Sequence, residues 1–301
     1  MKTVMMGAQS IMLGMNDVVV CGGMESMSNI PYYVPNARWG HKFGGGKLVD
    51  GLEKDGLRDA YAQTAMGNCA DATAKKYGIS RAQQDAFAIQ SYERAAAATA
   101  SGAYKAEIIP VNIPQRKGDD IIMTEDEEYK RVNFAKIPAL RPAFSKDGTV
   151  TAANASTIND GASALILVSK AMLKKLKLKP VAQILSFADA AQEPQWFTTT
   201  PPLAAKKAIK LAGIRKTQID YFEVNEAFAV VPMRAMDDLG VSHDKVNVNG
   251  GAIALGHPLG STGCMLMGTL IDEMERQGKG TGIVSLCIGG GMGIATIIER
   301  V

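Results

Sequence analysis

The chain has 301 residues, of which 47% are hydrophobic and 21% are charged, and this composition is typical of a globular protein with a sizeable core. Its 33 Lys and Arg residues and 30 Asp and Glu residues give a net charge of +3, which is too balanced for a nucleic-acid-binding surface. No apolar run approaches the roughly 18 residues that a membrane-spanning helix requires, so no membrane partner is expected.

The N-terminal elements are a helix followed by a strand. The pattern of apolar residues predicts a helix over Met1–Leu13, which Gly14 ends. A short apolar run then predicts a buried strand over Asp17–Val20, ending at Gly22-Gly23. This N-terminus has a single Lys and no clear cleavage site, so it is interpreted as a helix and not as a signal peptide.

The region from about residue 24 to residue 148 differs from the rest of the chain in its residue pattern. Proline, glycine and charged residues interrupt its short elements, and it shows no alternation of strands and helices. Two helices are predicted within it. One covers roughly Met66–Tyr77, and the other follows the capping box Ser80-x-x-Gln83 and ends near Gly102.

Strands and helices alternate regularly in the second half. The predicted elements are the strands Ala164–Val168 and Ala182–Phe187, the helix Leu203–Leu211, the strand Asp220–Val224, the helix Ala227–Leu239, the strand Lys245–Asn249, the helix Ser261–Arg276 and the strands Gly282–Cys287 and Gly293–Glu299. Such alternation predicts an α/β fold with helices on the faces of layered sheets. The last two strands are joined directly, which makes the sheet mixed.

Three short motifs contain residues suited to chemistry: Asn225-Glu226-Ala227-Phe228-Ala229, Gly256-His257-Pro258-Leu259-Gly260 and Cys287-Ile288-Gly289-Gly290-Gly291. The thiol of Cys287 has an ordinary pKa of roughly 8.5, so it can exchange a proton with a carbon acid, and the glycines beside it expose backbone N–H groups to an oxyanion. The alternative is a buried structural cysteine before a tight turn.

The other two motifs also allow a structural alternative. A neutral His257 imidazole can bind a carbonyl oxygen or accept a thiol proton, whereas His41 and His243 are expected to be surface-loop histidines. Asn225 can be the N-cap of the helix that follows it, with Glu226 as an acidic residue of the first turn.

In this order, the three motifs resemble the thiolase family, which makes or breaks a carbon–carbon bond beside a coenzyme A thioester. The resemblance implies a layered α/β/α/β/α fold of two similar halves, with mixed sheets and a loop domain inserted in the first half. Residues 1–23 and 157–178 would then be an incomplete N-terminal half, residues 24–156 the inserted loop domain for coenzyme A binding and oligomerisation, and residues 179–301 the C-terminal half.

The resemblance also assigns roles. Cys287 would be the acid/base that takes the α-proton of acetyl-CoA, and the Gly289 amide would help to hold the acyl oxyanion. His257 would activate a nucleophilic cysteine and line a second oxyanion site, where Asn225 would hold a water. The implied coenzyme A contacts are Leu57, Met66, Tyr92, Arg131, Val132, Asn133, Lys136, Phe144, Ser156, Ala227 and Phe228, although the charge run around Arg131 is ordinarily a solvated face.

Two details point to the short-chain, potassium-responsive branch of the family, namely Trp196-Phe197 and the string Ala152-Ala153-Asn154-Ala155-Ser156. The resemblance implies a potassium site formed by Tyr92 and by the carbonyls of Ala152, Ala153, Ala155 and Ile253. No covalently bound cofactor is expected. Ala65 departs from the pattern, because many acetoacetyl-CoA thiolases carry a His there, and this leaves one thioester contact open.

The expected reaction is the condensation of two acetyl-CoA molecules to acetoacetyl-CoA and its reverse, thiolysis. The family's nucleophilic cysteine stands four residues before the Met-Lys of Cys-x-Ser-Gly-Met-Lys, and this chain begins at Met1-Lys2. The chain as given therefore lacks this cysteine and is expected to be inactive alone. In the family, the segment that holds the cysteine also contains most strands of the first half, so the Asp17–Val20 and Ala164–Val168 strands are expected to lack partners and to have uncovered apolar faces. Two alternatives remain open: a non-catalytic fragment that binds coenzyme A or docks with intact subunits, and a longer-chain 3-ketoacyl-CoA thiolase.

Four cysteines, without a Cys-x-x-Cys pair or a histidine cluster, predict neither a zinc site nor a disulfide framework. Cys21, Cys69 and Cys264 have no nearby His in sequence, so none is expected to replace the missing nucleophile. Free thiols suit a reducing compartment, here the cytoplasm or the mitochondrial matrix. The resemblance implies a homodimer or homotetramer that binds acyl-CoA and CoA, with Pro31–Tyr61, containing Tyr32, Tyr33 and Trp39, as the tetramer-forming loop.

Overall fold

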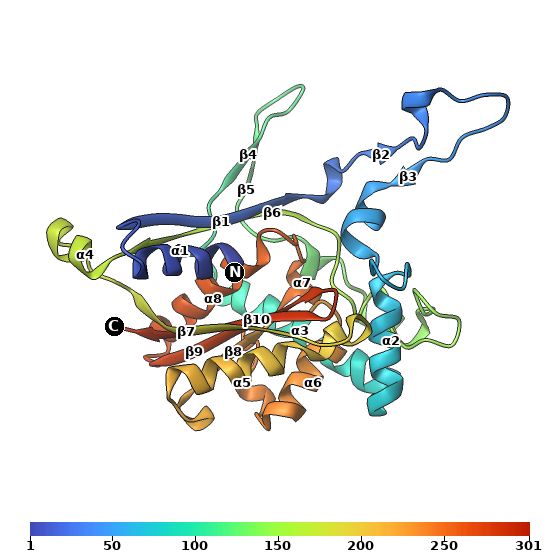
Figure 1. The fold of residues 1–301 in the computed structure, drawn as a ribbon. Coiled ribbons are helices and arrows are strands. Elements are labelled where there is room, and N and C mark those ends of the chain that lie inside the picture. The colour runs from blue at the N-terminus through green and yellow to red at the C-terminus, as the bar shows by residue number, and fades with distance from the viewer.

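The computed structural model describes all residues from Met1 to Val301 (Figure 1). Its helices are α1 (Lys2–Met12), α2 (Met66–Tyr77), α3 (Arg81–Ser101), α4 (Lys170–Leu176), α5 (Pro201–Ala212), α6 (Val230–Leu239), α7 (Ala252–Leu255) and α8 (Thr262–Arg276). Its strands are β1 (Val18–Ser26), β2 (Tyr32–Tyr33), β3 (Val49–Asp50), β4 (Val111–Ile113), β5 (Ile121–Met123), β6 (Asp160–Val168), β7 (Ala182–Ala191), β8 (Tyr221–Val224), β9 (Thr281–Gly289) and β10 (Met292–Arg300). No helix is both long enough and apolar enough to cross a bilayer.

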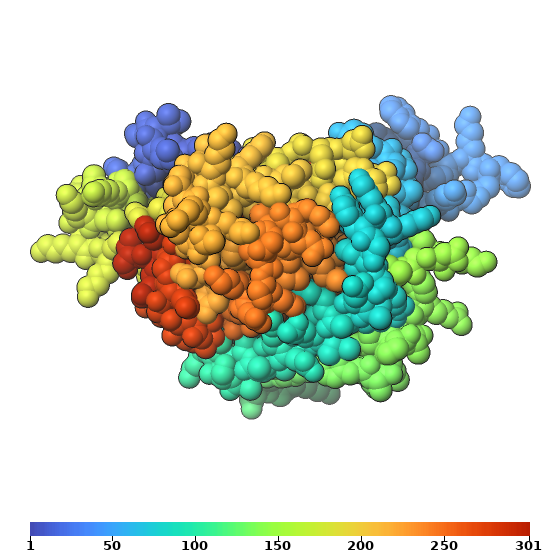
Figure 2. Space-filling model, turned by 90° about the horizontal axis from the view of Figure 1, so that it is seen from below, coloured from blue at the N-terminus to red at the C-terminus, as the bar shows by residue number.

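The main sheet has the strand order β7-β10-β9-β8. Its first two pairings are antiparallel and the pairing of β8 with β9 is parallel, so the sheet is mixed, as the sequence predicts. Helices α1 and α8 lie between this sheet and the β1–β6 pair, and α5 and α6 cover its other face (Figure 1). From that side, the gold and orange surfaces of α5 and α6 are flanked by the cyan surface of α2 (Figure 2). This stacking confirms the layered α/β architecture.

The β1–β6 pair corrects one expectation and bears out another. The two strands do not lack partners, because they pair with each other in an antiparallel register from Val18↔Val168 to Ser26↔Asp160. Their inner face packs on α1 and α8. Their outer face is uncovered, and its apolar side chains at Val20 and Ile166 are 71% and 67% exposed.

The strand also continues through the glycines that were expected to end it. A Cβ atom on Gly23 would lie 1.8 Å from the carbonyl oxygen of Gly260, so only glycine allows β1 to approach the loop after His257 this closely. The two glycines therefore mark a close contact between backbones and not a strand end.

The predicted strand Lys245–Asn249 is wrong. Only an isolated bridge joins Val246 to Phe222, and a 3-10 turn occupies His243–Lys245. The cause is Asn247, whose backbone is left-handed, with φ of 48°. Its side-chain amide accepts from the Val224 N–H and donates to the Val224 carbonyl, each at 2.8 Å, so a side chain takes the place of the strand ladder beside β8.

The two helices predicted before residue 103 have the expected ends. Helix α2 closes on Gly78, and α3 begins at a Ser80–Gln83 capping box and closes on Gly102, with both glycines left-handed. Two hairpins that the sequence did not predict, β2–β3 and β4–β5, project from the body of the molecule (Figure 1).

Candidate active site

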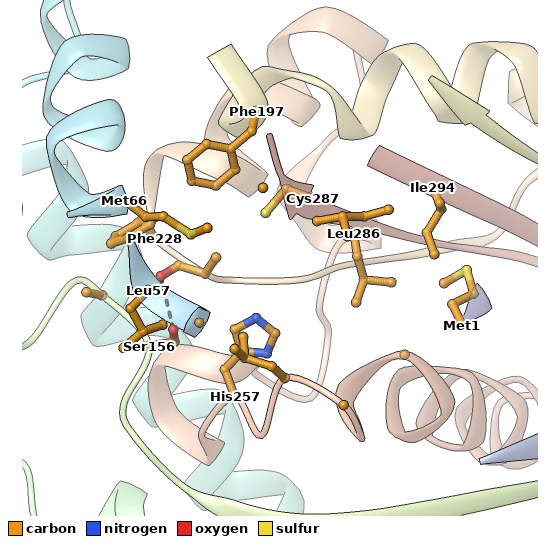
Figure 3. A pocket seen from close by; sticks show the side chains of 18 of the residues that line it. Met1, Leu57, Met66, Ser156, Phe197, Phe228, His257, Leu286, Cys287 and Ile294 are labelled. Carbon is orange, nitrogen blue, oxygen red and sulfur yellow. Dashed lines mark hydrogen bonds between the residues drawn. The ribbon is translucent and has the colours of Figure 1, made fainter. Parts of the chain in front are cut away.

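A cavity of about 400 Å³ lies between the end of β9, the loop before α8 and the loop domain. His257 and Cys287 both line it, and their side chains face the same space from opposite walls (Figure 3). The predicted residues that line the cavity are Leu57, Met66, Phe144, Ser156, Ala227, Phe228, His257, Cys287 and Gly289. Residues more than 200 positions apart in the sequence thus meet in one apolar pocket.

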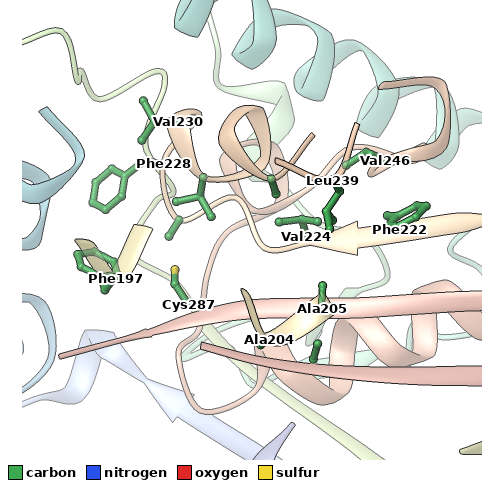
Figure 4. Packing of buried hydrophobic residues seen from close by; sticks show 14 of the residues in the cluster. Phe197, Ala204, Ala205, Phe222, Val224, Phe228, Val230, Leu239, Val246 and Cys287 are labelled. Carbon is green, nitrogen blue, oxygen red and sulfur yellow. The ribbon is translucent and has the colours of Figure 1, made fainter. Parts of the chain in front are cut away.

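Cys287 lies near the end of β9, just before the turn to β10. The three glycines of this turn, Gly289, Gly290 and Gly291, have φ of 85°, 57° and 83°, a left-handed run that L-residues rarely adopt. The thiol packs among buried side chains that include Phe197 and Phe228 (Figure 4). This burial raises the pKa of the Cys287 thiol to about 12, so the thiol is neutral in the resting protein.

His257 is held from both ring nitrogens. Its Nδ1 lies 2.7 Å from the hydroxyl oxygen of Thr262, and its Nε2 lies 3.1 Å from the amide nitrogen of Asn225. The Thr262 hydroxyl donates its only proton to the carbonyl of Pro258, so it accepts from Nδ1–H. Nε2 is then an unprotonated base that faces the cavity, and desolvation lowers the pKa of His257 to about 4.

NMR spectroscopy can test the tautomer and the protonation of His257. We expect ¹⁵N spectra to show the Nδ1–H tautomer of His257 throughout pH 5 to 8, with protonation only as the pH approaches about 4. The unfolded chain takes up this proton at higher pH, since the ordinary pKa of histidine is about 6.5, so the ring reduces folding stability as the pH falls through that interval. A Thr262→Val variant, which removes the Nδ1 partner, should shift the tautomer balance. An Nε2–H signal in the unaltered protein would contradict the assignment.

Asn225 is not an N-cap, and the helix expected from Ala227 begins only at Val230. The intervening residues are not helical: Phe228 forms an isolated bridge with Ala155, and the Ser156 N–H and hydroxyl both donate to the Ala227 carbonyl, each at 3.1 Å. Asn225 is buried at the end of β8, and its Oδ1 has no hydrogen-bond partner. An unpartnered acceptor beside the cavity leaves room for a water or a substrate donor.

Glu226 has the structural role expected of it. Its buried carboxylate accepts from the Ser91 hydroxyl at 2.6 Å, from the Asn247 amide at 2.8 Å and from the Ile253 N–H at 3.2 Å. These contacts tie helix α3 and the short helix α7, which precedes His257, to the end of β8.

Several predicted residues lie outside the cavity. Tyr92 and Val132 pack in a separate apolar cluster that also contains Ile253. The guanidinium of Arg131 pairs with Glu127 at 2.6 Å and lines a second, acidic hollow of about 320 Å³. The roles of these residues, and of Asn133 and Lys136, in binding the nucleotide stay predictions.

The structure adds residues that the sequence did not single out. Thr262 sets the protonation of His257, and Leu286, Ile288 and Ile294 form an apolar wall of the cavity. His243, expected on a surface loop, is half-buried and stacks on Phe87 with ring centroids 4.8 Å apart. Cys21, Cys69 and Cys264 are free and buried, and none of them lines the cavity.

Comparisons with known proteins agree with this geometry. Residues 1–171 match the family described as "Thiolase, N-terminal domain", and residues 178–300 match "Thiolase, C-terminal domain". An acetyl-CoA acetyltransferase of Schizosaccharomyces pombe is 50% identical over 302 residues, which cover 100% of this chain and 76% of the relative. A cytosolic acetyl-CoA acetyltransferase of Gibberella zeae is 49% identical (100% of this chain, 76% of the relative), and a mitochondrial one of Danio rerio is 46% identical (100% and 71%).

Solved structures show the same fold. A thiolase of Ascaris suum in complex with coenzyme A superposes with a TM-score of 0.93 at 45% identity, covering 100% of this chain and 76% of the other. Human mitochondrial 3-ketoacyl-CoA thiolase gives a TM-score of 0.96 at 39% identity, with the same coverage. By its sequence motifs, its layered fold and these relatives, the chain belongs to the thiolase family of enzymes.

Proposed function

We propose that this chain performs the carbon-acid chemistry of an acetyl-CoA acetyltransferase, which joins two acetyl-CoA molecules into acetoacetyl-CoA and reverses that reaction. The supporting observation is the meeting of Cys287 and His257 in one apolar cavity, with the Asn225 amide nitrogen 3.1 Å from His257 Nε2. The identity of 46–50% to acetyl-CoA acetyltransferases over the whole chain supports the substrate class.

The proposed step begins with the Cys287 thiolate. It takes the α-proton of acetyl-CoA, so that the C–H bond breaks, an S–H bond forms and the electron pair moves to the thioester oxygen. The Asn225 side-chain amide has a second N–H besides the one directed at His257 Nε2, and this N–H donates to the oxygen. The enolate carbon then attacks an acyl thioester, from which the thiolate leaves. In the reverse direction the neutral Cys287 thiol returns the proton to carbon, which suits a thiol with a pKa of about 12.

The acyl-accepting thiol of the complete reaction is a separate requirement. Of the four cysteines only Cys287 lines the cavity, and the same residue cannot both carry the acyl group and move the α-proton. We therefore expect the 301-residue chain alone to enolise acetyl-CoA without completing thiolysis of acetoacetyl-CoA.

The test separates these two activities. Exchange of the α-protons of acetyl-CoA in D₂O, followed by NMR, is expected to proceed with the chain and to fall to the uncatalysed rate without it. Loss of the acetoacetyl-CoA enolate absorbance on addition of CoA is expected to be absent. Coenzyme A binding without exchange would instead support a non-catalytic binding fragment. Full thiolysis would contradict the expectation that the chain alone cannot complete that reaction.

The same assay addresses chain length. The bulky side chains of Met66, Phe197 and Phe228 stand close to Cys287 in the cavity, which favours a short acyl group (Figure 3). We expect exchange to fall steeply from acetyl-CoA to octanoyl-CoA. Equal rates for both thioesters would support the longer-chain 3-ketoacyl-CoA thiolase.

Coenzyme A is the proposed ligand of the cavity and of the surface beyond it. The apolar side chains of Leu57, Met66 and Phe144 suit the pantetheine arm, and the Ser156 hydroxyl adds a polar contact. Arg131 and Lys136 are proposed to meet the phosphates, where Arg131 would exchange its carboxylate partners Glu127 and Glu128 for phosphate oxygens.

A potassium ion is proposed beside the site. The carbonyls of Ala152, Ala153, Ala155 and Ile253 accept no hydrogen bond within the chain, and the Tyr92 hydroxyl has no partner, so this donor set fits a weakly bound hard cation. If it binds there, KCl should raise the melting temperature more than NaCl does, and Tyr92→Phe should reduce that difference.

The β2–β3 arm is the proposed contact between subunits of a homo-oligomer. Its Trp39 is 85% exposed, and Tyr32 and Phe43 are also exposed, which is unusual for large apolar side chains in a single chain. The Tyr33 hydroxyl instead bonds to Asp55 at the base of the arm. The four reduced cysteines suit the cytoplasm or the mitochondrial matrix as the proposed compartment.

A further inference from the structure

The segment from Gln192 to Thr200, called here the clamp segment, links β7 to α5 and lies against the glycine turn after Cys287. It contains a 3-10 helix over Pro194–Thr199. Its Phe197 lines the cavity beside Cys287 (Figures 3 and 4). Its other buried residues, Thr198, Thr199 and Thr200, do not line the cavity. The hydrogen bonds of the segment hold the glycine turn instead.

The carbonyl of Gly291 is the point at which the clamp segment holds the turn. The Gln192 backbone N–H and the Thr200 hydroxyl both donate to this oxygen, each at 3.0 Å. The backbones of Gly291 and Gln192 are also in close contact, since a Cβ atom on Gly291 would lie 2.1 Å from the Gln192 carbonyl oxygen. The end of the turn is thus fixed by residues more than 90 positions away in the sequence.

The donors are themselves held in place. The Gln192 side-chain amide nitrogen lies 2.8 Å from the Trp196 carbonyl oxygen and the Thr199 hydroxyl and 2.9 Å from the Thr200 hydroxyl, so its two protons are shared among these three acceptors. The Thr200 hydroxyl has one proton, and the Gly291 carbonyl at 3.0 Å is a nearer acceptor for it than the Trp196 carbonyl at 3.4 Å. Thr200 is fully buried, so water cannot replace this bond.

A turn of three left-handed glycines has no side chains to hold it. We propose that Gln192 and Thr200 are positioning residues, which lock the turn through the Gly291 carbonyl and thereby fix the Cys287 thiol and the Gly289 amide relative to the bound thioester. The inference rests on the proposed function for its effect on catalysis, but its effect on the turn is independent of any reaction.

The test compares two buried threonines of one segment. Thr200→Val removes the bond to Gly291. Thr198→Val is the matched control, because Thr198 is equally buried and bonds only to the Thr73 hydroxyl, at 2.7 Å, away from the turn. Thr200→Ser keeps the hydroxyl and serves as the rescue.

Thr200→Val is expected to lower the maximal rate of acetyl-CoA α-proton exchange by about 10–100-fold, the size of effect that a small misplacement of reacting groups produces. The dissociation constant for CoA, measured by calorimetry, should change by less than about twofold, since the bond contributes to positioning and not to binding. Thr200→Ser should recover most of the rate, and Thr198→Val should retain it despite a lower melting temperature. Equal losses of rate in Thr200→Val and Thr198→Val would overturn the inference.

Amide hydrogen exchange separates this inference from the proposed function. Thr200→Val should speed exchange of the Gly289–Met292 amides, while Thr198→Val should not. If the unaltered chain fails to enolise acetyl-CoA but exchange of the turn amides is faster in Thr200→Val alone, the proposed function is wrong and the positioning role of Gln192 and Thr200 is supported. If the turn amides are unaffected, the clamp is wrong whatever the activity.

Discussion

Cys287→Ala is expected to lower α-proton exchange of acetyl-CoA by about 10²–10⁴-fold, the contribution typical of a positioned general acid/base. The thiol is the only cysteine that lines the cavity, where the other titratable groups are His257, Lys2 and the N-terminal amine of Met1. Binding of CoA should persist, because alanine removes one sulfur from an apolar wall and leaves the remaining contacts in place. Cys287→Ser should not restore the rate, since a hydroxyl is a far weaker acid than a thiol.

The pH dependence of the same reaction reports the protonation of Cys287. Exchange begins with the thiolate, and the pKa of this thiol is raised to about 12 by burial. The thiolate fraction, and with it the exchange rate, should therefore increase about tenfold per pH unit between pH 6.5 and 9. A rate that levels off below pH 9 in the free chain would show that Cys287 is not the base, or that its surroundings are more polar than its packing indicates.

The elements that the sequence predicts well have local signals. Helices α2 and α3 are framed by glycines and by the Ser80–Gln83 capping box, and both ends are where those signals put them. Local chemistry suffices for such elements, because a residue's neighbours in sequence are also its neighbours in space. The meeting of His257 and Cys287 was expected instead from the resemblance of their motifs to the thiolase family.

The errors arise where a distant contact overrides the local pattern. Val246-Asn247-Val248-Asn249 alternates as a strand would, but the Asn247 side chain occupies the hydrogen bonds of β8 instead. Glycine at position 23 is typical of a strand end, but here it permits the close contact of β1 with the Gly260 carbonyl, more than 200 residues away in sequence. The clamp on Gly291 and the hydroxyl that orients His257 have no sequence signal of their own, because threonine is common and only its geometry gives it a role.

Gly23→Ala is expected to damage both folding and catalysis. The added Cβ would lie 1.8 Å from the Gly260 carbonyl oxygen, and both groups belong to backbone, so neither can rotate away. Overpacking of this kind costs about 1–3 kcal/mol of unfolding free energy or more, measurable by denaturant titration. Relief of the clash pushes the loop of His257 to Gly260 away from β1, so α-proton exchange should fall by about 10²-fold, as a displacement of about 1 Å produces.

The reciprocal variant and a matched control make this result interpretable. Gly260→Ala places its Cβ 2.4 Å from the Met24 carbonyl oxygen and should reproduce both losses from the opposite side of the contact. Gly268→Ala adds the same methyl group to the middle of helix α8, where its nearest neighbour is the Glu107 carboxylate at 3.6 Å, so it should be neutral or stabilising by about 0.5–1 kcal/mol. If Gly23→Ala unfolds at the same denaturant concentration as the unaltered chain and keeps its exchange rate, β1 does not support the His257 loop. The position of the imidazole would then have to come from Thr262 and Asn225 alone.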